Sequence, residues 1–336
     1  MTSKKTITFN TSGYDGFIDF IKAYAILCVL FGHTFGPILD KVAYGVWAGM
    51  QVPLFILVQA FHCYKKDSYK VKIGKVLKRV FLPFLVLELL TFLIALACGS
   101  ECNSMIHNGL IGGGYGPGSY FPWIYIQVAV LLPFIAILFK NCKRETALIV
   151  FLIICEGFEV LFSYINISEE AYRLLCPRYL FLFFLGWLWA KDGVKINVWT
   201  ILISSISFAS IIYFEYFSVY DEPWFFTTGF TFHRWPCYFF VALGFTALLN
   251  KVWAFLSRYK TIVLYTSVIA SASYEIFLLQ MSIIYLFHSD SLFFVSSGFL
   301  RYGMWLLIVW IFSIVGGVYL HLIINKYKIN DLRQIR

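Results

Sequence analysis

The sequence predicts an all-α protein that crosses a membrane many times, and two observations lead to this fold class. Of the 336 residues, 60% are hydrophobic and only 13% are charged, which is far more apolar than a soluble globular protein. Apolar stretches of roughly 15 to 25 residues, about the length that spans a bilayer as a helix, recur along the whole chain. We therefore expect a single integral-membrane domain over residues 1–336, with the lipid bilayer as a partner.

Ten of these stretches are predicted to be transmembrane helices that together form a polytopic bundle. Most are runs of apolar and aromatic residues, but Pro177 and Arg178 interrupt the start of the sixth. In chain order, the predicted helices cover residues 17–37, 44–63, 80–98, 122–139, 147–164, 174–190, 198–217, 235–249, 263–287 and 302–324.

The distribution of the 27 Lys and Arg residues orients these helices. Lys22 lies inside the first helix. Apart from it and from five residues in the loops of the opposite side, every Lys and Arg lies in the tails and loops of one side of the membrane. This asymmetry follows the positive-inside rule and predicts that both termini are cytoplasmic. The net charge of +9 therefore suits anionic lipid or a phosphate-bearing substrate, and we expect no nucleic-acid partner. The opposite loops hold Lys41, Arg173, Arg178, Arg234 and Arg301.

The first helix, FIDFIKAYAILCVLFGHTF, contains the most informative pattern in the chain. The eleven-residue step from Lys22 to His33 returns to within about 20° of the same helix face, about 16 Å further along. Asp19 lies three residues before Lys22 and can neutralise it. Ionisable groups inside a span are costly and often functional. The alternative is that Asp19 and Lys22 pair at the membrane interface while His33 packs in the core.

A basic run follows the second helix and ends just before Pro83. Lys75, Lys78 and Arg79 are spaced three and four residues apart, which predicts that they share one face at the inner mouth of the third helix. Such a cluster suits the phosphates of a substrate. It equally suits a topology anchor that contacts acidic lipid headgroups.

The predicted outer loop before the fourth helix reads IGGGYGPGSYFPWIYIQ. Backbone rich in glycine, as at Gly116 and Gly118, can bend sharply and approach a ligand closely. The aromatic residues that follow, among them Tyr120 and Trp123, are typical either of a surface on which sugars stack or of an interfacial aromatic belt. Gln127 adds a polar group at the start of the fourth helix.

Further polar residues lie in the fifth, sixth and ninth helices. Glu156 and Glu159 are three residues apart, so either they pair with a basic group such as Arg178 or one of them is protonated. Glu275 and Gln280 belong to the segment SASYEIFLLQ. Since the histidines and the eight cysteines lack the spacing of metal ligands, we expect no metal site.

These segments, taken in order, resemble acyltransferase family 3, whose members are bacterial ten-helix membrane O-acyltransferases. The chain differs from many members at Gln59 and Ala60, where a Ser-Gly pair is common, at Lys22, where Arg is more common, and at Gln280, where His is common. The similar blocks are IDFIKAYAILCVLFGH, VPLF at 52–55, the basic run ending at Arg79, GPGSYFPWIYIQ at 116–127, YLFLFFLGW at 179–187 and SYEIFLLQ at 273–280.

The resemblance implies transfer of an acyl group, usually acetyl, from cytosolic acyl-CoA to a hydroxyl of an outward-facing glycan or lipid-linked saccharide. It implies that His33 is the catalytic base or a transient acyl carrier, with Asp19 and Lys22 beside it in the catalytic set. Lys22 and the basic cluster of Lys75, Lys78 and Arg79 would contact the CoA portion of the donor. Acyl-CoA is then a donor substrate, no cofactor stays bound, and the location is the bacterial inner membrane.

The residues agree with this expectation, because acyl transfer to a hydroxyl needs a proton acceptor and neutral imidazole is suited to that role near pH 7. Gln127, Tyr125 and the amides of the glycine-rich loop are candidates for stabilising the oxyanion. Two alternatives stay open: a small secreted molecule as acceptor, and a secondary transporter or flippase of a glycan precursor. Transporters commonly have two related halves, and we find no internal counterpart of the Lys22 to His33 pattern.

Overall fold

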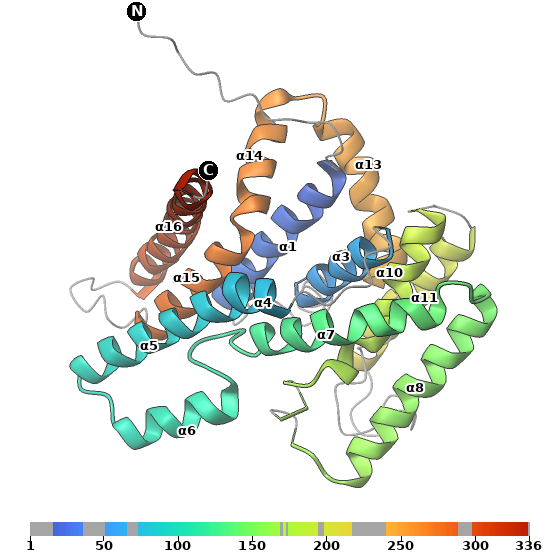
Figure 1. The fold of residues 1–336 in the computed structure, drawn as a ribbon, viewed down its shortest axis with the longest axis horizontal. Coiled ribbons are helices and arrows are strands. Elements are labelled where there is room, and N and C mark those ends of the chain that lie inside the picture. Colours follow the sequence, from blue (N-terminus) through green and yellow to red (C-terminus); the bar gives the residue numbers. More distant parts are fainter. Residues whose placement is uncertain are drawn as a thin grey trace, which may run out of the picture.

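The computed structural model describes residues 16–35, 51–65, 73–168, 171–172, 174–193, 198–216, 240–287 and 298–334, and all regular structure in these residues is helical (Figure 1). The helices up to the middle of the chain are α1 (Gly16–Phe35), α3 (Val52–Lys65), α4 (Ile73–Val76), the π-helical turn η1 (Leu77–Phe81), α5 (Leu82–Ala97), α6 (Cys102–Gly112), α7 (Phe121–Phe139) and α8 (Arg144–Tyr164). They are followed by the 3₁₀ turn η2 (Cys176–Tyr179), α10 (Leu180–Asp192), α11 (Val198–Tyr216), the π-helical turn η3 (Phe240–Phe245), α13 (Thr246–Leu256), α14 (Lys260–Ser271), α15 (Ser273–Leu286) and α16 (Gly298–Gln334).

Helix α1 is an interior helix that contacts α3, α13, α14 and α15. Its apolar residues pack on several sides, and Ile21, Ile26 and Leu30 are fully buried. Of the polar residues predicted to be functional, Asp19 is buried, while Lys22 and His33 are partly exposed.

Helix α3 packs beside α1 on one side and closely against α10 on another. A Cβ atom on Gly186 of α10 would lie 2.4 Å from the Cβ of Ala60, so only glycine permits this approach. The two helices form the centre of the apolar core together with Phe121 and Phe277. Gly186 thus accommodates the side chain of Ala60.

Helices α14 and α15 form a bent pair that meets at Ala272 with an angle of 63°. The bend redirects α15 toward α5, and α16 packs along α15 (Figure 1). Gly317 makes this packing close, because a Cβ there would lie 2.6 Å from the Cα of Ile276. As a result α15 contacts α1, α5 and α16 and links them.

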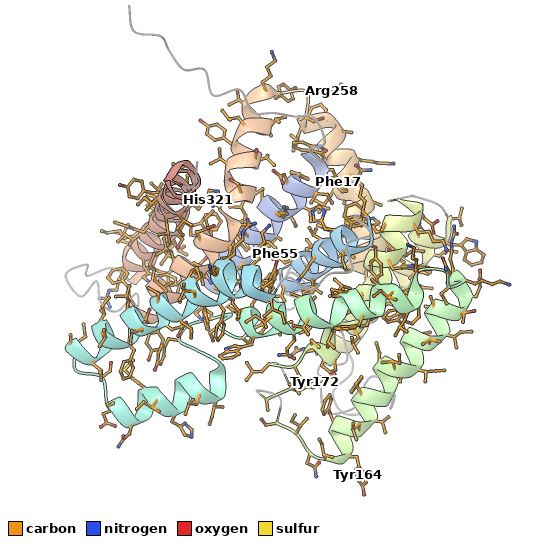
Figure 2. All side chains as sticks on the ribbon, in the orientation of Figure 1. Phe17, Phe55, Tyr164, Tyr172, Arg258 and His321 are labelled. Carbon is orange, nitrogen blue, oxygen red and sulfur yellow. The ribbon has the colours of Figure 1, made fainter. Side chains whose placement is uncertain are left out.

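The described residues contain four helices that are long and apolar enough to cross a membrane, or five if the bent pair counts as one span. The four cover residues 16–35, 73–97, 121–139 and 298–324. Large apolar side chains are exposed on the outer faces of α5, α7, α8 and α16, and Tyr164 at the end of α8 in Figure 2 is 85% exposed. Such faces suit contact with lipid.

Each of the ten predicted segments contains helix in its described residues, while ten membrane spans and cytoplasmic termini stay predictions. Residues 36–37, 44–50, 217 and 235–239 lie outside the described part. Residues 174–179 are a turn and a 3₁₀ segment ahead of α10. The prediction of one continuous helix over 263–287 was wrong, because the chain bends at Ala272. The predicted third-to-fourth loop also contains a further helix, α6.

Candidate active site

His33, on the last turn of α1, is joined to Gln280 of α15 by a hydrogen bond of 3.1 Å between Nδ1 and Oε1. Gln280 is fully buried, and its Nε2 donates to the carbonyl of Pro117 at 3.3 Å. A carbonyl oxygen can only accept, so this second bond fixes which end of the amide faces Pro117. The amide oxygen of Gln280 is therefore the group that faces His33.

This arrangement decides the tautomer of a neutral His33. Since the amide oxygen is an acceptor, Nδ1 must carry the proton, and the lone pair then lies on Nε2. The residue as a whole is half-buried. A positioned imidazole whose Nε2 carries the lone pair is the arrangement that general-base chemistry requires.

The glycine-rich loop lies directly against this pair. A Cβ on Gly118 would lie 2.9 Å from the Phe277 ring and 3.6 Å from Cε1 of His33. A Cβ on Gly116 would lie 2.3 Å from the carbonyl oxygen of Met281. Both glycines have positive φ, +87° at Gly116 and +91° at Gly118, a conformation that other residues rarely adopt. Gly118 is therefore brought to His33, and Gly116 to Met281, the residue that follows Gln280.

Glu88 of α5 holds the other end of the loop. Its carboxylate is buried and accepts a hydrogen bond of 2.6 Å from the backbone N–H of Tyr115. The Tyr115 ring lies beside Phe92 and Tyr285. Burial raises the pKa of Tyr115, and the neighbouring Tyr285, Glu88 and Cys102 raise it further, so its phenol stays neutral.

Asp19 and Lys22 lie on α1 but far from His33. Their side chains form an ion pair of 3.7 Å, with Asp19 buried and Lys22 about 30% exposed. The helical rise separates Lys22 from His33 by about 16 Å. This pair can therefore act on a different part of a substrate from the part that meets His33.

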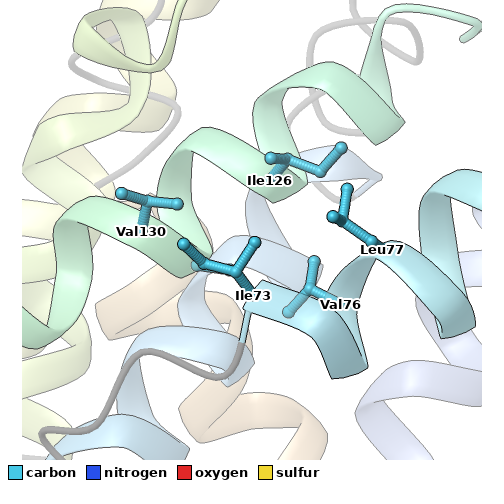
Figure 3. A pocket seen from close by; sticks show the side chains of 6 residues that line it. Ile73, Val76, Leu77, Ile126 and Val130 are labelled. Carbon is cyan, nitrogen blue, oxygen red and sulfur yellow. The ribbon is translucent and has the colours of Figure 1, made fainter.

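The basic residues Lys75, Lys78 and Arg79 lie on α4 and η1, and all three are exposed. The phenol of Tyr274 on α15 donates to the carbonyl of Val80 at 2.6 Å, which ties η1 to the helix that carries Gln280. On its apolar side this segment forms a small hollow against α7 (Figure 3), without polar side chains and separate from the His33 network. The hollow is lined by Ile73, Val76, Leu77, Ile126, Ala129 and Val130.

Two predicted acceptor residues already bond to backbone. The indole N–H of Trp123 donates to the carbonyl of Gly113 at 2.6 Å. Gln127 donates to the carbonyl of Leu174 at 2.6 Å and accepts from the N–H of Cys176 at 3.0 Å. Both side chains thereby hold main chain in place, which makes Gln127 unsuited to stabilise an oxyanion. Tyr120 is half-buried beside the loop.

The remaining predicted residues lie away from the His33 and Gln280 bond. Glu156 is half-buried on α8, which contacts the η2 turn that holds Arg178, and the Glu159 side chain lies outside the described residues. Glu275 lies 3.2 Å from Nδ1 of His321 on α16. In the described part of the chain, no group of three or more His, Cys, Asp or Glu could hold a metal ion.

Sequence reasoning missed the partners that surround His33. It singled out Gln280 as a polar residue but gave no reason to pair it with His33, 247 residues earlier. Glu88 was likewise recognisable as a carboxylate in an apolar segment, but nothing in the sequence indicated its bond to Tyr115. Thr34 and Trp310, which bond to each other at 3.2 Å, carry no comparable signal.

The sequence was compared with known proteins. The sequence model of one family, acyltransferase family 3, described as an acyltransferase domain, matches residues 15–326. Neither the comparison with curated proteins nor that with solved structures gives a match.

Proposed function

The chain belongs to acyltransferase family 3, and from this premise we propose that it is a membrane O-acyltransferase that uses acyl-CoA, with acetyl-CoA as the donor of choice. The acceptor in this proposal is a hydroxyl of an outward-facing glycan or lipid-linked saccharide, and the location is the bacterial inner membrane. Acyl-CoA is a substrate and no cofactor stays bound. Family membership favours acyl transfer over the transporter hypothesis.

The observation that carries the proposal is the bond between His33 and Gln280. With Nδ1 engaged, Nε2 of His33 takes the proton of the acceptor hydroxyl while its oxygen attacks the thioester carbonyl. The new C–O bond replaces the C–S bond, and the proton passes from His33 to the departing CoA sulfur. The products are the ester and the free thiol of CoA. Gln280 keeps the ring in the required tautomer throughout.

The proposed donor contacts are Lys75, Lys78 and Arg79. They are exposed cations, and phosphates form strong charge-assisted hydrogen bonds with such groups. The Tyr274 to Val80 bond supports a connection between this cluster and the helix that carries Gln280. Lys22, paired with Asp19 at the same predicted side of the membrane, is a further proposed contact for the donor.

The proposed acceptor site is the glycine-rich loop above His33. Gly118 brings the backbone of the loop close to the imidazole, since a Cβ there would lie 3.6 Å from Cε1 of His33. The loop and His33 both belong to the predicted outer side, where a surface glycan is available. The acceptor hydroxyl would enter between the loop and Nε2 of His33.

The test compares His33→Gln and His33→Ala with the wild-type protein and with His107→Gln, which changes an exposed histidine on α6. Transfer from labelled acetyl-CoA to glycans is measured in membrane vesicles of the expressing strain, and mass spectrometry identifies the acylated product. Loss of a general base typically costs 10²- to 10⁴-fold in rate. We expect both His33 variants to lose activity with normal yield and melting, while His107→Gln keeps it. Near-normal turnover in His33→Gln would refute the role of His33.

A further inference from the structure

Thr34, the residue after His33, is the end point of hydrogen bonds from another helix. It is fully buried on the last turn of α1. Its Oγ1 donates to the carbonyl of Leu30 at 2.7 Å and accepts from the indole N–H of Trp310 at 3.2 Å. Its own carbonyl accepts from the phenol of Tyr302. Both Tyr302 and Trp310 belong to α16.

These bonds matter because of their place in α1. Thr34 directly follows His33, and a turn that other helices bind opens less readily than one that they do not. The Thr34 carbonyl accepts from the Tyr302 phenol. Trp310 holds the side chain of the same residue. The turn that carries His33 is thereby fixed from α16.

The same helix also supports the partner of His33. Gly316 and Gly317 allow α16 to pack closely on Leu279 and Ile276 of α15, next to Gln280. Both members of the His33 and Gln280 pair are thus braced by α16. Their 3.1 Å hydrogen bond is sensitive to small displacements of either side chain, because a shift of about 0.5 Å takes it beyond ordinary hydrogen-bond length.

We propose that Thr34 and Trp310 are positioning residues that hold the imidazole of His33 against Gln280. The proposal rests on the proposed function, in which His33 is the base. Neither residue touches the reacting atoms. Their effect passes through the last turn of α1, so it appears in the rate of transfer and leaves binding of the CoA portion unchanged.

The variants are Trp310→Phe, which removes the indole N–H together with part of the ring system, and Thr34→Val, which removes the hydroxyl at nearly constant shape. Trp305→Phe is a matched control, because it also removes an indole N–H from α16, one that bonds the carbonyl of Phe287 at 2.6 Å. Thr34→Ser keeps the hydroxyl and should rescue the loss. Each variant is assayed for acetyl transfer in membrane vesicles at several acetyl-CoA concentrations and for melting temperature.

We expect Trp310→Phe and Thr34→Val to lower kcat about tenfold, the effect of losing one ordinary hydrogen bond. KM for acetyl-CoA should stay within about twofold of the wild-type value, because poorer positioning of His33 leaves the contacts to CoA intact. Trp305→Phe and Thr34→Ser should keep near wild-type kcat. Equal kcat losses in Trp310→Phe and Trp305→Phe, or a wild-type kcat in Thr34→Val, would overturn the proposal.

Hydrogen exchange measured by mass spectrometry gives a readout that does not depend on activity. The amides of residues 31–35 should exchange faster in Trp310→Phe and Thr34→Val than in Trp305→Phe. Unchanged exchange there contradicts the positioning role even if the acceptor differs from the one proposed. If exchange at residues 31–35 is fast in Trp310→Phe and Thr34→Val, but His33→Gln remains active, the proposed function is contradicted. The bonds from α16 would then still stabilise the last turn of α1.

Discussion

Replacing Gly116 by alanine tests the contact between the glycine-rich loop and α15. The added Cβ would lie 2.3 Å from the carbonyl oxygen of Met281, whereas Cβ atoms essentially never approach another atom within 3.0 Å. Relief requires the loop and α15 to separate by about 1 Å. The side chain also has to adopt a φ of +87°. Gly116→Ala should therefore disturb both the fold and the candidate active site.

Two contributions set the magnitude. A non-glycine residue in a left-handed conformation costs about 1–2 kcal/mol, and overpacking of a tight contact costs about 1–3 kcal/mol. Together they predict destabilisation of about 2–5 kcal/mol. The Gln280 to Pro117 bond, 3.3 Å long, would then be lost, because a further 1 Å exceeds hydrogen-bond length. His33 loses its oriented partner in consequence.

The assay is thermal unfolding of the detergent-purified protein, combined with acetyl transfer in membrane vesicles. Gly112→Ala is the matched control, since a Cβ at Gly112 meets nothing within 4 Å and alanine favours a helix over glycine by about 0.5–1 kcal/mol. We expect Gly116→Ala to melt several degrees lower and to lose most of its activity, and Gly112→Ala to match the wild type. Wild-type melting and activity in Gly116→Ala would refute the described packing of loop and helix.

Two further predictions concern orientation and the donor. In a cysteine-depleted background, an impermeant thiol reagent should label a cysteine at exposed Ser100 in intact cells and one at exposed Lys143 only after lysis; the reverse pattern would contradict the predicted topology. Neutralising Lys75, Lys78 and Arg79 together should raise KM for acetyl-CoA about tenfold or more, because its phosphates lose their cationic partners. An unchanged KM for acetyl-CoA in the correctly inserted triple variant would indicate that the cluster orients the helices in the membrane and does not bind the donor. The control neutralises three other exposed cations on the same predicted side, Lys251, Arg258 and Lys260.

Helices that are apolar over their whole length could be located from the sequence. The run 17–37 is helical as α1 as far as the structure describes it, and the run 122–139 coincides with α7 within one residue, because a glycine-rich loop and a lysine bound it. Ser271 and Ser273 can loosen a helix, but they did not locate the bend at Ala272, since small residues there keep the hydropathy of a continuous helix. α6 was missed because it is short and only partly apolar.

The sequence by itself determined the membrane class, the family resemblance and the choice of His33 as the candidate catalytic residue, because these depend on composition, on local spacing and on the cost of polar groups inside a span. Only the tertiary structure decided which residues meet His33. The pairing with Gln280, the approach of Gly118 and the bracing of Thr34 by Trp310 join segments distant in the chain. It also assigned Trp123 and Gln127 to backbone contacts. Such partners depend on how each helix is rotated and packed against its neighbours, and hydropathy along a single chain does not contain that information.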